Sequence, residues 1–399
     1  MQPDYDLIIA GGGLAGNCLA LALKDTGLRY AIVEAVTHEQ LHTSPAGDRA
    51  LALAYGTILM LEKLHIWQGI STKATAIKNI HISDRGHFGK VRLSAQKERV
   101  EALGYVITAR DLEDHVANLV KKSGIISFCP ARVTGLNANT NEINVTLKQG
   151  NGDLNLSAYL LVGADGGSSS IRNLLGISQK ICDYGQTALV TTVKSSLSHK
   201  NTAFERFTDS GPLAFLPLGK NQSAVVWTRT SPDAKNLMSG SESEFLAALQ
   251  QCFGYKLGEL SLCAPRRSFP LSLIRAEKMI SNRAVIIGNA VHQLHPVAGQ
   301  GFNLGLRDVM KLAQLLNEKP ETNFDPGEHE FLSAYAQARQ KDHDLVIGFT
   351  DNIVRIFSND WMPLSALRNL GLGLLDNIPF AKSLLCNYAM GFTLERLKI

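Results

Sequence analysis

The first 35 residues of the chain contain the pattern that most restricts its fold. The apolar run at 5–10, YDLIIA, predicts a buried parallel strand, and the segment at 17–27 has apolar residues at helical spacing and ends in glycine. A second apolar run, YAIVEA at 30–35, completes a strand–helix–strand unit. Between the first strand and the helix stands the motif G-x-G-x-x-G, formed by Gly11, Gly13 and Gly16. This order predicts a dinucleotide-binding α/β unit.

Each glycine of this motif has a distinct physical role. The first permits a tight turn, the second lets backbone approach a pyrophosphate, and the third lets helix and strand pack closely. The helix begins at Leu14 and Ala15, and its free N–H groups attract phosphate. Glu34 ends the second strand, where its carboxylate can accept hydrogen bonds from an adenosine ribose. The motif does not distinguish FAD from NAD, and a glycine-rich turn without a ligand is the alternative.

Two later segments repeat the pattern of a buried strand that runs into a glycine turn. The first is GADGGSSSIR at 163–172, in which Asp165 leads toward a helix through serines and Arg172. A simple NAD domain has no need of this second turn, although an ordinary capped turn would also explain Asp165. The other is GNAVHQLHPVAGQGFNLGLRD at 288–308. A helix that begins there can direct backbone N–H groups at the pyrimidine edge of an isoalloxazine ring, and its dipole stabilises the charge of reduced flavin.

Composition excludes several classes of protein. The 399 residues exceed what one hydrophobic core usually serves, and the formal charge of +4 is too small to predict nucleic-acid binding. Six scattered cysteines without a C-x-x-C pair indicate reduced thiols and no metal site. No run approaches the roughly 18 apolar residues of a membrane span. We expect a cytoplasmic protein and leave open a peripheral contact with the inner face of the membrane.

The three glycine turns together resemble those of the group A flavoprotein monooxygenases. The string HPVAGQGFNLGLRD at 295–308 is similar to the signature of the branch that hydroxylates polyprenylated phenols in ubiquinone biosynthesis. Further runs, including WQGI, HISDRGH, AFERFT, GPLAFLP and NLGLRDVM, resemble the hydroxylases in that branch that act on 2-polyprenyl-6-methoxyphenol. The resemblance extends along essentially the whole chain. It implies hydroxylation of a phenolic ring through a flavin C(4a)-hydroperoxide, with NAD(P)H and O2 as co-substrates.

The resemblance also implies an α/β fold of the p-hydroxybenzoate hydroxylase type. In this fold a Rossmann-type FAD-binding domain is interleaved with a β-sheet substrate domain and followed by a C-terminal helical region. We expect the FAD-binding domain to comprise 1–75, 105–180 and 276–320, the sheet domain 76–104 and 181–275, and the helical region 321–399. Within these segments, the pattern from Gly47 to Leu64 predicts a helix, and Ser241 with Glu244 predicts a capping box.

The site residues that the resemblance implies come from all three turns. Arg49 is expected near the FAD phosphates, Arg110 against the cofactor, and Asp165 where both FAD and NAD(P)H are supported. Asn289 stands where the superfamily usually has aspartate, and its amide oxygen can still accept a hydrogen bond. The full expected set is Gly11, Gly13, Leu14, Ala15, Gly16, Glu34, Arg49, Arg110, Asp165, Gly288, Asn289, Pro296, Gly299, Gln300, Gly301, Phe302 and Asn303.

Several functional assignments stay open at this level. His292 and His295 flank the flavin loop and are the nearest candidates for a phenol base, although structural histidines are the alternative. Phe215, Pro217 and Trp227 are expected to line an apolar substrate pocket or to form sheet core. The apolar and basic stretch 350–399 could contact membrane or partner proteins of ubiquinone biosynthesis, or could cap the FAD domain. A sister hydroxylase acting at another ring position and an FAD-containing scaffold are the rival functions.

Overall fold

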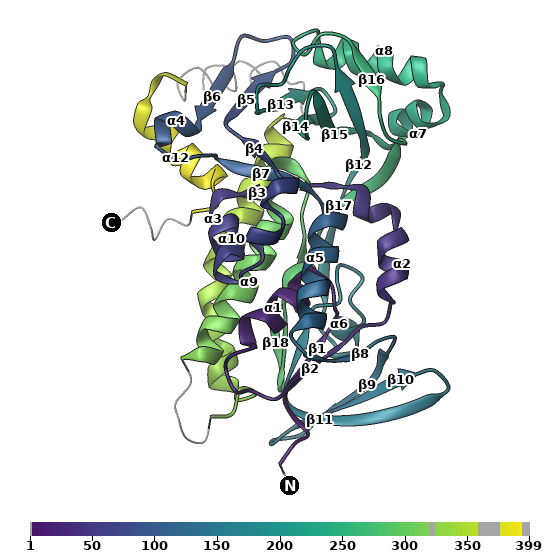
Figure 1. Cartoon of the computed structure of the whole chain (residues 1–399), viewed down its shortest axis with the longest axis vertical. Coiled ribbons are helices and arrows are strands. Elements are labelled where there is room, and N and C mark those ends of the chain that lie inside the picture. Colours follow the sequence, from purple (N-terminus) through teal and green to yellow (C-terminus); the bar gives the residue numbers. More distant parts are fainter. Residues whose placement is uncertain (1, 319–323, 358–375, 393–399) are drawn as a thin grey trace.

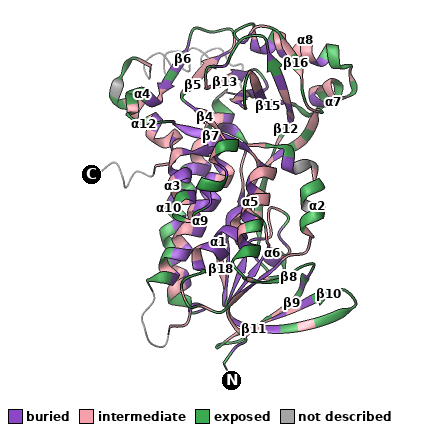
Figure 2. Cartoon of the chain, viewed as in Figure 1, coloured by how far each residue is buried: buried purple, intermediate pink, exposed green. Residues whose placement is uncertain are grey.

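The computed structural model describes residues 2–318, 324–357 and 376–392. Its two large sheets lie at opposite ends of an elongated molecule, with long helices running along one side between them (Figure 1). Buried residues concentrate in the parallel strands of the lower sheet and in the helices that cover it (Figure 2). The fold therefore has one helix-covered α/β layer and one sheet-rich layer.

The parallel core of the first sheet is built from the strands that the sequence predicts, together with β8 (Ile126–Phe128), which it did not predict. β1 (Tyr5–Ala10) lies between β2 (Tyr30–Val33) and β11 (Gly152–Gly163), and β2 pairs with β8. β19 (Ala284–Ile286) pairs with β11 in parallel. The ends of these strands meet at one edge, because Ala10 stands opposite both Val33 and Gly163. All three glycine turns follow strands that end at this edge.

An antiparallel extension and three helices complete this layer. β9 (Arg132–Ala138) and β10 (Ile143–Gln149) form an antiparallel meander with β11, and β18 (Ile280–Ser281) pairs with β19. A single apolar cluster joins the sheet to α1 (Leu14–Leu23), α5 (Ala109–Lys122) and α9 (Gln300–Asn317). α2 (His38–Thr43) follows β2, and α6 (Ser170–Leu174) follows β11 and precedes β12 (Gln179–Ser195) of the second sheet.

The second sheet has the strand order β20-β17-β12-β15-β14-β13-β5-β6. Its members are β5 (Asn79–Asp84), β6 (Lys90–Ser94), β12 (Gln179–Ser195), β13 (Thr202–Thr208), β14 (Gly211–Pro217), β15 (Gln222–Thr230), β16 (Leu260–Leu262), β17 (Arg267–Ala276) and β20 (His292–Gln293). α7 (Ser231–Ser239) and α8 (Glu242–Phe253) cover one face of it. The capping box at Ser241 and Glu244 is confirmed at the start of α8. β20 belongs to this sheet although we expected its residues in the FAD-binding domain.

The predicted helix between Gly47 and Leu64 is wrong in its first half. β3 (Ala50–Ala54) is a strand that pairs with β7 (Gly104–Thr108), which also pairs with β4 (Thr75–Ile77). The helix α3 starts only at Tyr55 and ends at Lys63. The alternating alanine and leucine residues at 50–54 are compatible with a helix or with a strand. They form a strand here because β7 offers backbone hydrogen bonds along one of its edges.

The C-terminal region contains α10 (His329–Phe357) and α12 (Pro379–Ala389), while α4 (Ala95–Glu98) follows β6. α10 packs on α9, and Cys386 of α12 and Met390 just after it form a cluster with Val91 and Leu93 of β6. Within the described residues, none of the helices is both long and apolar enough to cross a bilayer. Of the basic residues in the stretch 350–399, Arg368, Arg396 and Lys398 lie outside the described residues.

Candidate active site

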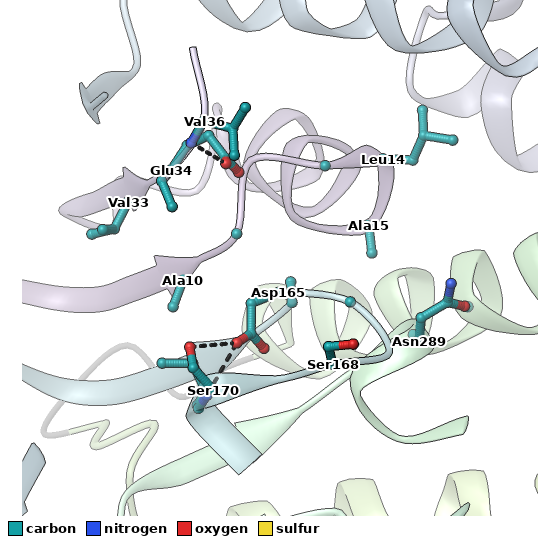
Figure 3. A pocket seen from close by; sticks show the side chains of 18 of the residues that line it. Ala10, Leu14, Ala15, Val33, Glu34, Val36, Asp165, Ser168, Ser170 and Asn289 are labelled. Carbon is teal, nitrogen blue, oxygen red and sulfur yellow. Dashed lines mark hydrogen bonds between the residues drawn. The ribbon is translucent and has the colours of Figure 1, made fainter. Parts of the chain in front are cut away.

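A cavity of about 480 Å³ lies at the edge where the parallel strands end. The three glycine turns all line it, through Gly11 and Gly13, through Asp165 and Gly166, and through Gly288 and Asn289. Figure 3 shows side chains from the first two turns facing a common space, with Asn289 at its far end. Segments separated by more than a hundred residues in the sequence are therefore brought together, as the motifs predicted.

The first turn offers backbone rather than side chains to this cavity. Gly13, Leu14 and Ala15 line it at the start of α1, where the N–H groups of the first helical turn have no partner within the helix. Gly16 lies behind them, and a Cβ there would approach the Gly11 carbonyl oxygen to 1.9 Å. Glycine at position 16 thus lets α1 pack directly against the turn that follows β1.

Glu34 is held rigidly at the rim of the same cavity. Its Oε2 accepts a hydrogen bond from the Gly12 N–H at 2.5 Å, and its Oε1 accepts one from the Val36 N–H at 2.8 Å. The carboxylate lines the cavity in this fixed orientation (Figure 3). It can therefore accept further hydrogen bonds from a ligand hydroxyl without rearranging.

The second turn is both a helix cap and part of the cavity wall. Asp165 accepts hydrogen bonds from the Ser169 and Ser170 hydroxyls, at 2.5 and 3.0 Å, and from the Ile171 N–H at 3.0 Å. The buried guanidinium of Arg172 donates to the Gly167 carbonyl at 3.0 Å and to the Ala290 carbonyl at 2.9 Å. Arg172 therefore fastens the second turn to the third.

The third turn rests on a buried ionic cluster. The Gly288 N–H donates to Asp308 Oδ2 at 3.1 Å, and Arg339 Nε donates to Asp308 Oδ1 at 2.7 Å. His343 also contacts Asp308 Oδ1 at 2.7 Å, and His292 Nε2 lies 3.6 Å from Oδ2. These positive and polar neighbours hold the pKa of Asp308 well below its usual range, against the opposing effect of burial.

His292, Asp308 and His343 form a group of potential metal ligands whose ligating atoms lie within 4.8 Å of one another. The guanidinium of Arg339 bonds the same Asp308 oxygen that His343 contacts. A metal cation at that oxygen would face an adjacent fixed positive charge, which opposes its binding. The arrangement fits a structural ion cluster beneath the third turn.

The loop before α9 is tied to β3 rather than left free to face a ligand. Asn303 Oδ1 accepts from the Ala54 N–H at 3.0 Å and the Thr57 hydroxyl at 2.6 Å, and its Nδ2 donates to the Ala52 and Gly299 carbonyls at 3.0 and 2.7 Å. Gly299 has φ +61°, and a Cβ there would lie 2.9 Å from Ala52 Cβ. Gln300 is buried at the start of α9, whereas Gly301 and Phe302 line the cavity.

The two arginines expected near the cofactor occupy different positions. Arg49 lines the cavity beside Glu113, a residue that sequence reasoning missed because nothing in its helix distinguishes it. Arg110 instead pairs with Asp48 at 2.7 Å and donates to the Ser44 carbonyl at 3.1 Å. The side chain of Arg110 is absent from the cavity lining that the described residues form. It braces the loop before β3.

A second cavity, of about 590 Å³, lies between the nine-stranded sheet and the third turn. It shares Arg49, Asn289, Gly301 and Phe302 with the first cavity, so the two adjoin at the start of α9. Pro296, Gly299 and Asn303 also line it. Most of its remaining lining is apolar, and it extends to α10 and α12 through Phe349, Ile353, Leu385, Tyr388 and Ala389.

Of the two alternatives for Phe215 and Trp227, pocket lining or sheet core, the structure favours sheet core. Phe215 and Trp227 are buried on the opposite face of the sheet, in the cluster under α7 and α8, and Pro217 shares the strand parity of Phe215. Side chains alternate between the faces of a strand, so the neighbouring positions face the cavity. The lining residues of β14 and β15 are Ala214, Leu216 and Val226.

The two candidate histidines separate in the structure. His292 is buried beside Asp308 and lines neither cavity, and burial lowers its pKa. His295 lines the second cavity, and burial lowers its pKa to about 4. Its Nδ1 accepts a hydrogen bond from the Val297 N–H at 3.2 Å, so the proton of the neutral ring resides on Nε2. The neutral His295 ring therefore has its remaining N–H donor at Nε2 and no free acceptor nitrogen.

A carboxyl group that sequence reasoning missed also lines this cavity. Glu205 lies on β13, and burial raises its pKa to about 7. The sequence contains a signal for it in the run AFERFT, because alternate residues of a strand lie on one face and Glu205 therefore shares a face with Ala203 and Phe207. A charged residue on an otherwise apolar face of a strand indicates a functional position.

The residues of the first cavity fit an elongated flavin nucleotide. Apart from Gly13 and its chain neighbours, no atom of the described residues lies within 4 Å of the position that a Cβ of Gly13 would occupy, so a side chain there would enter open space beside the first cavity. The helix N-terminus suits the pyrophosphate, and the fixed Glu34 carboxylate suits a ribose. The first cavity adjoins the second at the residues that they share, and the flavin ring at the far end of the nucleotide would lie there.

Comparison with known proteins gives the same assignment. A family model described as an FAD binding domain matches residues 4–347. Ubiquinone hydroxylase UbiL of Rhodospirillum rubrum is 34% identical over 392 residues, which cover 97% of this chain and 89% of that protein. Ubiquinone hydroxylase UbiM of Neisseria meningitidis is 28% identical over 399 residues, covering 98% of this chain and 86% of the relative.

A solved structure supports the fold. p-Nitrophenol 4-monooxygenase PnpA from Pseudomonas putida superposes with a TM-score of 0.78 at 16% identity, covering 98% of this chain and 99% of that one. The likeness confirms the predicted α/β monooxygenase fold. From the matched domain and the relatives that span nearly the whole chain, we conclude that the protein belongs to the FAD-dependent aromatic monooxygenases, in their ubiquinone-biosynthesis branch.

Proposed function

We propose that the protein hydroxylates the aromatic ring of a polyprenylated phenol, of the 2-polyprenyl-6-methoxyphenol type, with NAD(P)H and O2. The observation that carries the proposal is the second cavity, which is largely apolar and adjoins the flavin-side loop at Gly301 and Phe302. An apolar cavity with few polar groups suits a ring with a hydrocarbon tail. The similarity to ubiquinone hydroxylases supports this substrate class.

The protein's own contribution is binding, orientation and exclusion of water. The start of α1 would hold the pyrophosphate of FAD, Glu34 the ribose, and Asn289 with Gly301 the flavin end of the first cavity. When bound, FAD supplies the redox and oxygen-activating chemistry of the reaction. Apolar residues of the second cavity would keep water from the reacting ring.

The direct test is product analysis with the purified, FAD-loaded protein. Addition of 2-prenyl-6-methoxyphenol should stimulate NAD(P)H oxidation and yield a product one oxygen atom heavier. Position-labelled precursors then separate this reaction from that of a sister hydroxylase. Substrate-independent NAD(P)H oxidation without a hydroxylated product would favour the scaffold function and contradict the proposal.

We further propose that α12 contacts the inner face of the membrane, where a polyprenyl substrate resides. One face of α12 lines the second cavity through Leu385, Tyr388 and Ala389. Large apolar side chains at its start and on its outer face are exposed, namely Ile378 at 45%, Phe380 at 80% and Leu384 at 40%. Such exposed side chains beside a substrate cavity suit insertion among lipid headgroups.

Flotation with vesicles of anionic phospholipid tests this contact. The double substitution Phe380→Ser and Leu384→Ser should reduce vesicle association severalfold. The matched control is Ile126→Ser on β8, which removes an exposed apolar side chain at the opposite end of the molecule (Figure 1). Equal flotation of all three proteins would contradict the membrane contact and leave binding of partner proteins as the explanation.

A further inference from the structure

We propose that Glu205 is a catalytic residue that accepts the proton of the substrate phenol in the second cavity. The inference rests on the proposed function, because it requires a phenolic ring in that cavity. It assigns the acid–base role to β13, a strand of the substrate sheet, rather than to the histidines near the flavin loop.

The position of Glu205 follows from the register of the sheet. β13 pairs Glu205 with Ile82 of β5 on one side and with Ala214 of β14 on the other. The row continues through Val226 of β15 to Val190 of β12, and all five side chains line the second cavity. One carboxyl group therefore stands in a floor of aliphatic side chains that spans five adjacent strands.

This carboxyl group lacks an interaction that would explain its placement. Its Oε1 is buried, and neither oxygen has a hydrogen-bond or salt-bridge partner among the described residues. The residue as a whole is partly exposed, but a buried carboxyl oxygen without a partner is costly, which favours a role toward a ligand over one in stability. Burial is also the cause that raises its pKa to about 7, so both protonation states are accessible near neutral pH.

The other titratable groups that line the cavity suit different roles. Arg49 is cationic, and the Nε2–H of the neutral His295 can only donate. Burial raises the pKa of Tyr388 far above neutrality, so its hydroxyl stays protonated. The faces of β5, β12, β14, β15, β17 and α10 that line the cavity contribute uncharged side chains. Among the described lining residues, Glu205 is thus the group that can take a proton near pH 7.

The proton balance of the step is simple. The phenol O–H bond breaks, its proton passes to a Glu205 oxygen, and the resulting phenolate donates electron density to the ring carbon that is hydroxylated. One atom of O2 enters the new C–O bond with a proton from solvent, and the other leaves as water. The hydrogens of that water come from the hydride of NAD(P)H, which also supplies two electrons, and from the proton lost by the ring carbon. The hydroxylated carbon then loses its hydrogen as a proton, and Glu205 returns its own proton to the phenolate oxygen.

The test uses the FAD-loaded full chain with 2-prenyl-6-methoxyphenol as the probe. Glu205→Gln keeps the shape of the side chain and its capacity for hydrogen bonds but cannot accept a proton. Glu205→Leu can neither form a hydrogen bond nor accept a proton. Phenol affinity is measured from the perturbation of the flavin spectrum, and hydroxylation from single-turnover product formation between pH 6 and 8. Glu259→Gln, an exposed change in the same domain, is the matched control.

In the wild type the hydroxylation rate should rise as the pH passes through about 7, because the carboxylate is the accepting form. Glu205→Gln should bind the phenol within a few-fold of wild type, yet hydroxylate about 10²-fold more slowly and without that pH dependence. Glu205→Leu should additionally weaken phenol binding about tenfold. The Glu259→Gln control should retain the wild-type profile.

Two outcomes would overturn the assignment in distinguishable ways. If Glu205→Gln hydroxylates the phenol at the wild-type rate and with the same pH profile, the catalytic role is wrong while the proposed function stands. If the wild type neither binds nor hydroxylates the phenol, the proposed function itself fails, and the inference fails with it.

Discussion

At the scale of single residues, buried polar side chains fix the loops of this site. The Asn303 amide makes four hydrogen bonds, two to the strand and helix at Ala54 and Thr57 and two to the Ala52 and Gly299 carbonyls. Three of these bonds join the start of α9 to the segment that contains β3, and the bond to the Gly299 carbonyl fixes the loop that leads into α9. The amide therefore sets the shape of the loop that carries Gly301 and Phe302 into both cavities.

Replacement of Asn303 by leucine should weaken both the fold and cofactor binding. The change leaves buried donors and acceptors without partners, and we expect a loss of about 3 kcal/mol in the free energy of unfolding. Urea denaturation and FAD retention on gel filtration measure the two effects. Asn317→Ala, at the exposed end of the same helix, should change each by much less, and an equal loss there would contradict the assigned role.

At the scale of elements, Asp308 holds α9, α10 and the third turn together. It is fully buried and receives a backbone N–H from Gly288 and a guanidinium N–H from Arg339. His343, one turn beyond Arg339 on α10, contacts the same carboxylate. The pairing explains how a 29-residue helix from the C-terminal region supports a turn of the nucleotide site.

Substitution of Asp308 by asparagine should destabilise the protein at pH 7. It breaks the buried ion pair between Asp308 and Arg339 and leaves the Arg339 guanidinium paired with Asp342 alone, and breaking a buried pair typically costs about 3 kcal/mol or more. The pKa of Asp308 is lowered in the folded state, so its contribution is complete above about pH 4 and is lost as the pH falls through the lowered value. Urea unfolding of wild type and variant should therefore converge only in strong acid; a constant difference down to pH 2 would contradict this.

At the scale of the whole molecule, the site exists only where separate segments meet. The three glycine turns belong to three separate segments of the chain. Residues of the second sheet line the adjoining cavity. Arg172 joins two of the turns directly through its bonds to the Gly167 and Ala290 carbonyls. Cofactor affinity should therefore depend on contacts that never touch the cofactor.

Replacement of Arg172 by methionine tests this dependence. Methionine fills a similar volume but donates no hydrogen bond, and each bond from a charged donor contributes about 1.5–3 kcal/mol. We expect the Kd for FAD to rise at least about tenfold, since about 1.4 kcal/mol corresponds to that factor. Titration of apoprotein with FAD measures it. The exposed Arg99→Met is the control, and equal affinities in both variants would refute the link.

The sequence by itself determined the parallel strands, the three turns and their convergence. Apolar runs that end in glycine mark strand tips, and parallel strands place such tips at one edge of a sheet. Local signals also predicted the capping box at Ser241, because its two hydrogen bonds lie within one helical turn. Whatever depended on neighbours in the sequence could thus be anticipated from it.

Tertiary structure alone decided the rest. Alternation shows that Phe215 and Trp227 share a face of their strands, but the helices α7 and α8 determine that this face is core and that the other lines the cavity. The strand at Ala50–Ala54 likewise depends on β7, which pairs with it from fifty residues away. Which strand an element pairs with, and which of its faces is buried, depends on the elements that pack against it in the tertiary structure. A sequence pattern therefore gives the periodicity of an element but does not identify those packing partners.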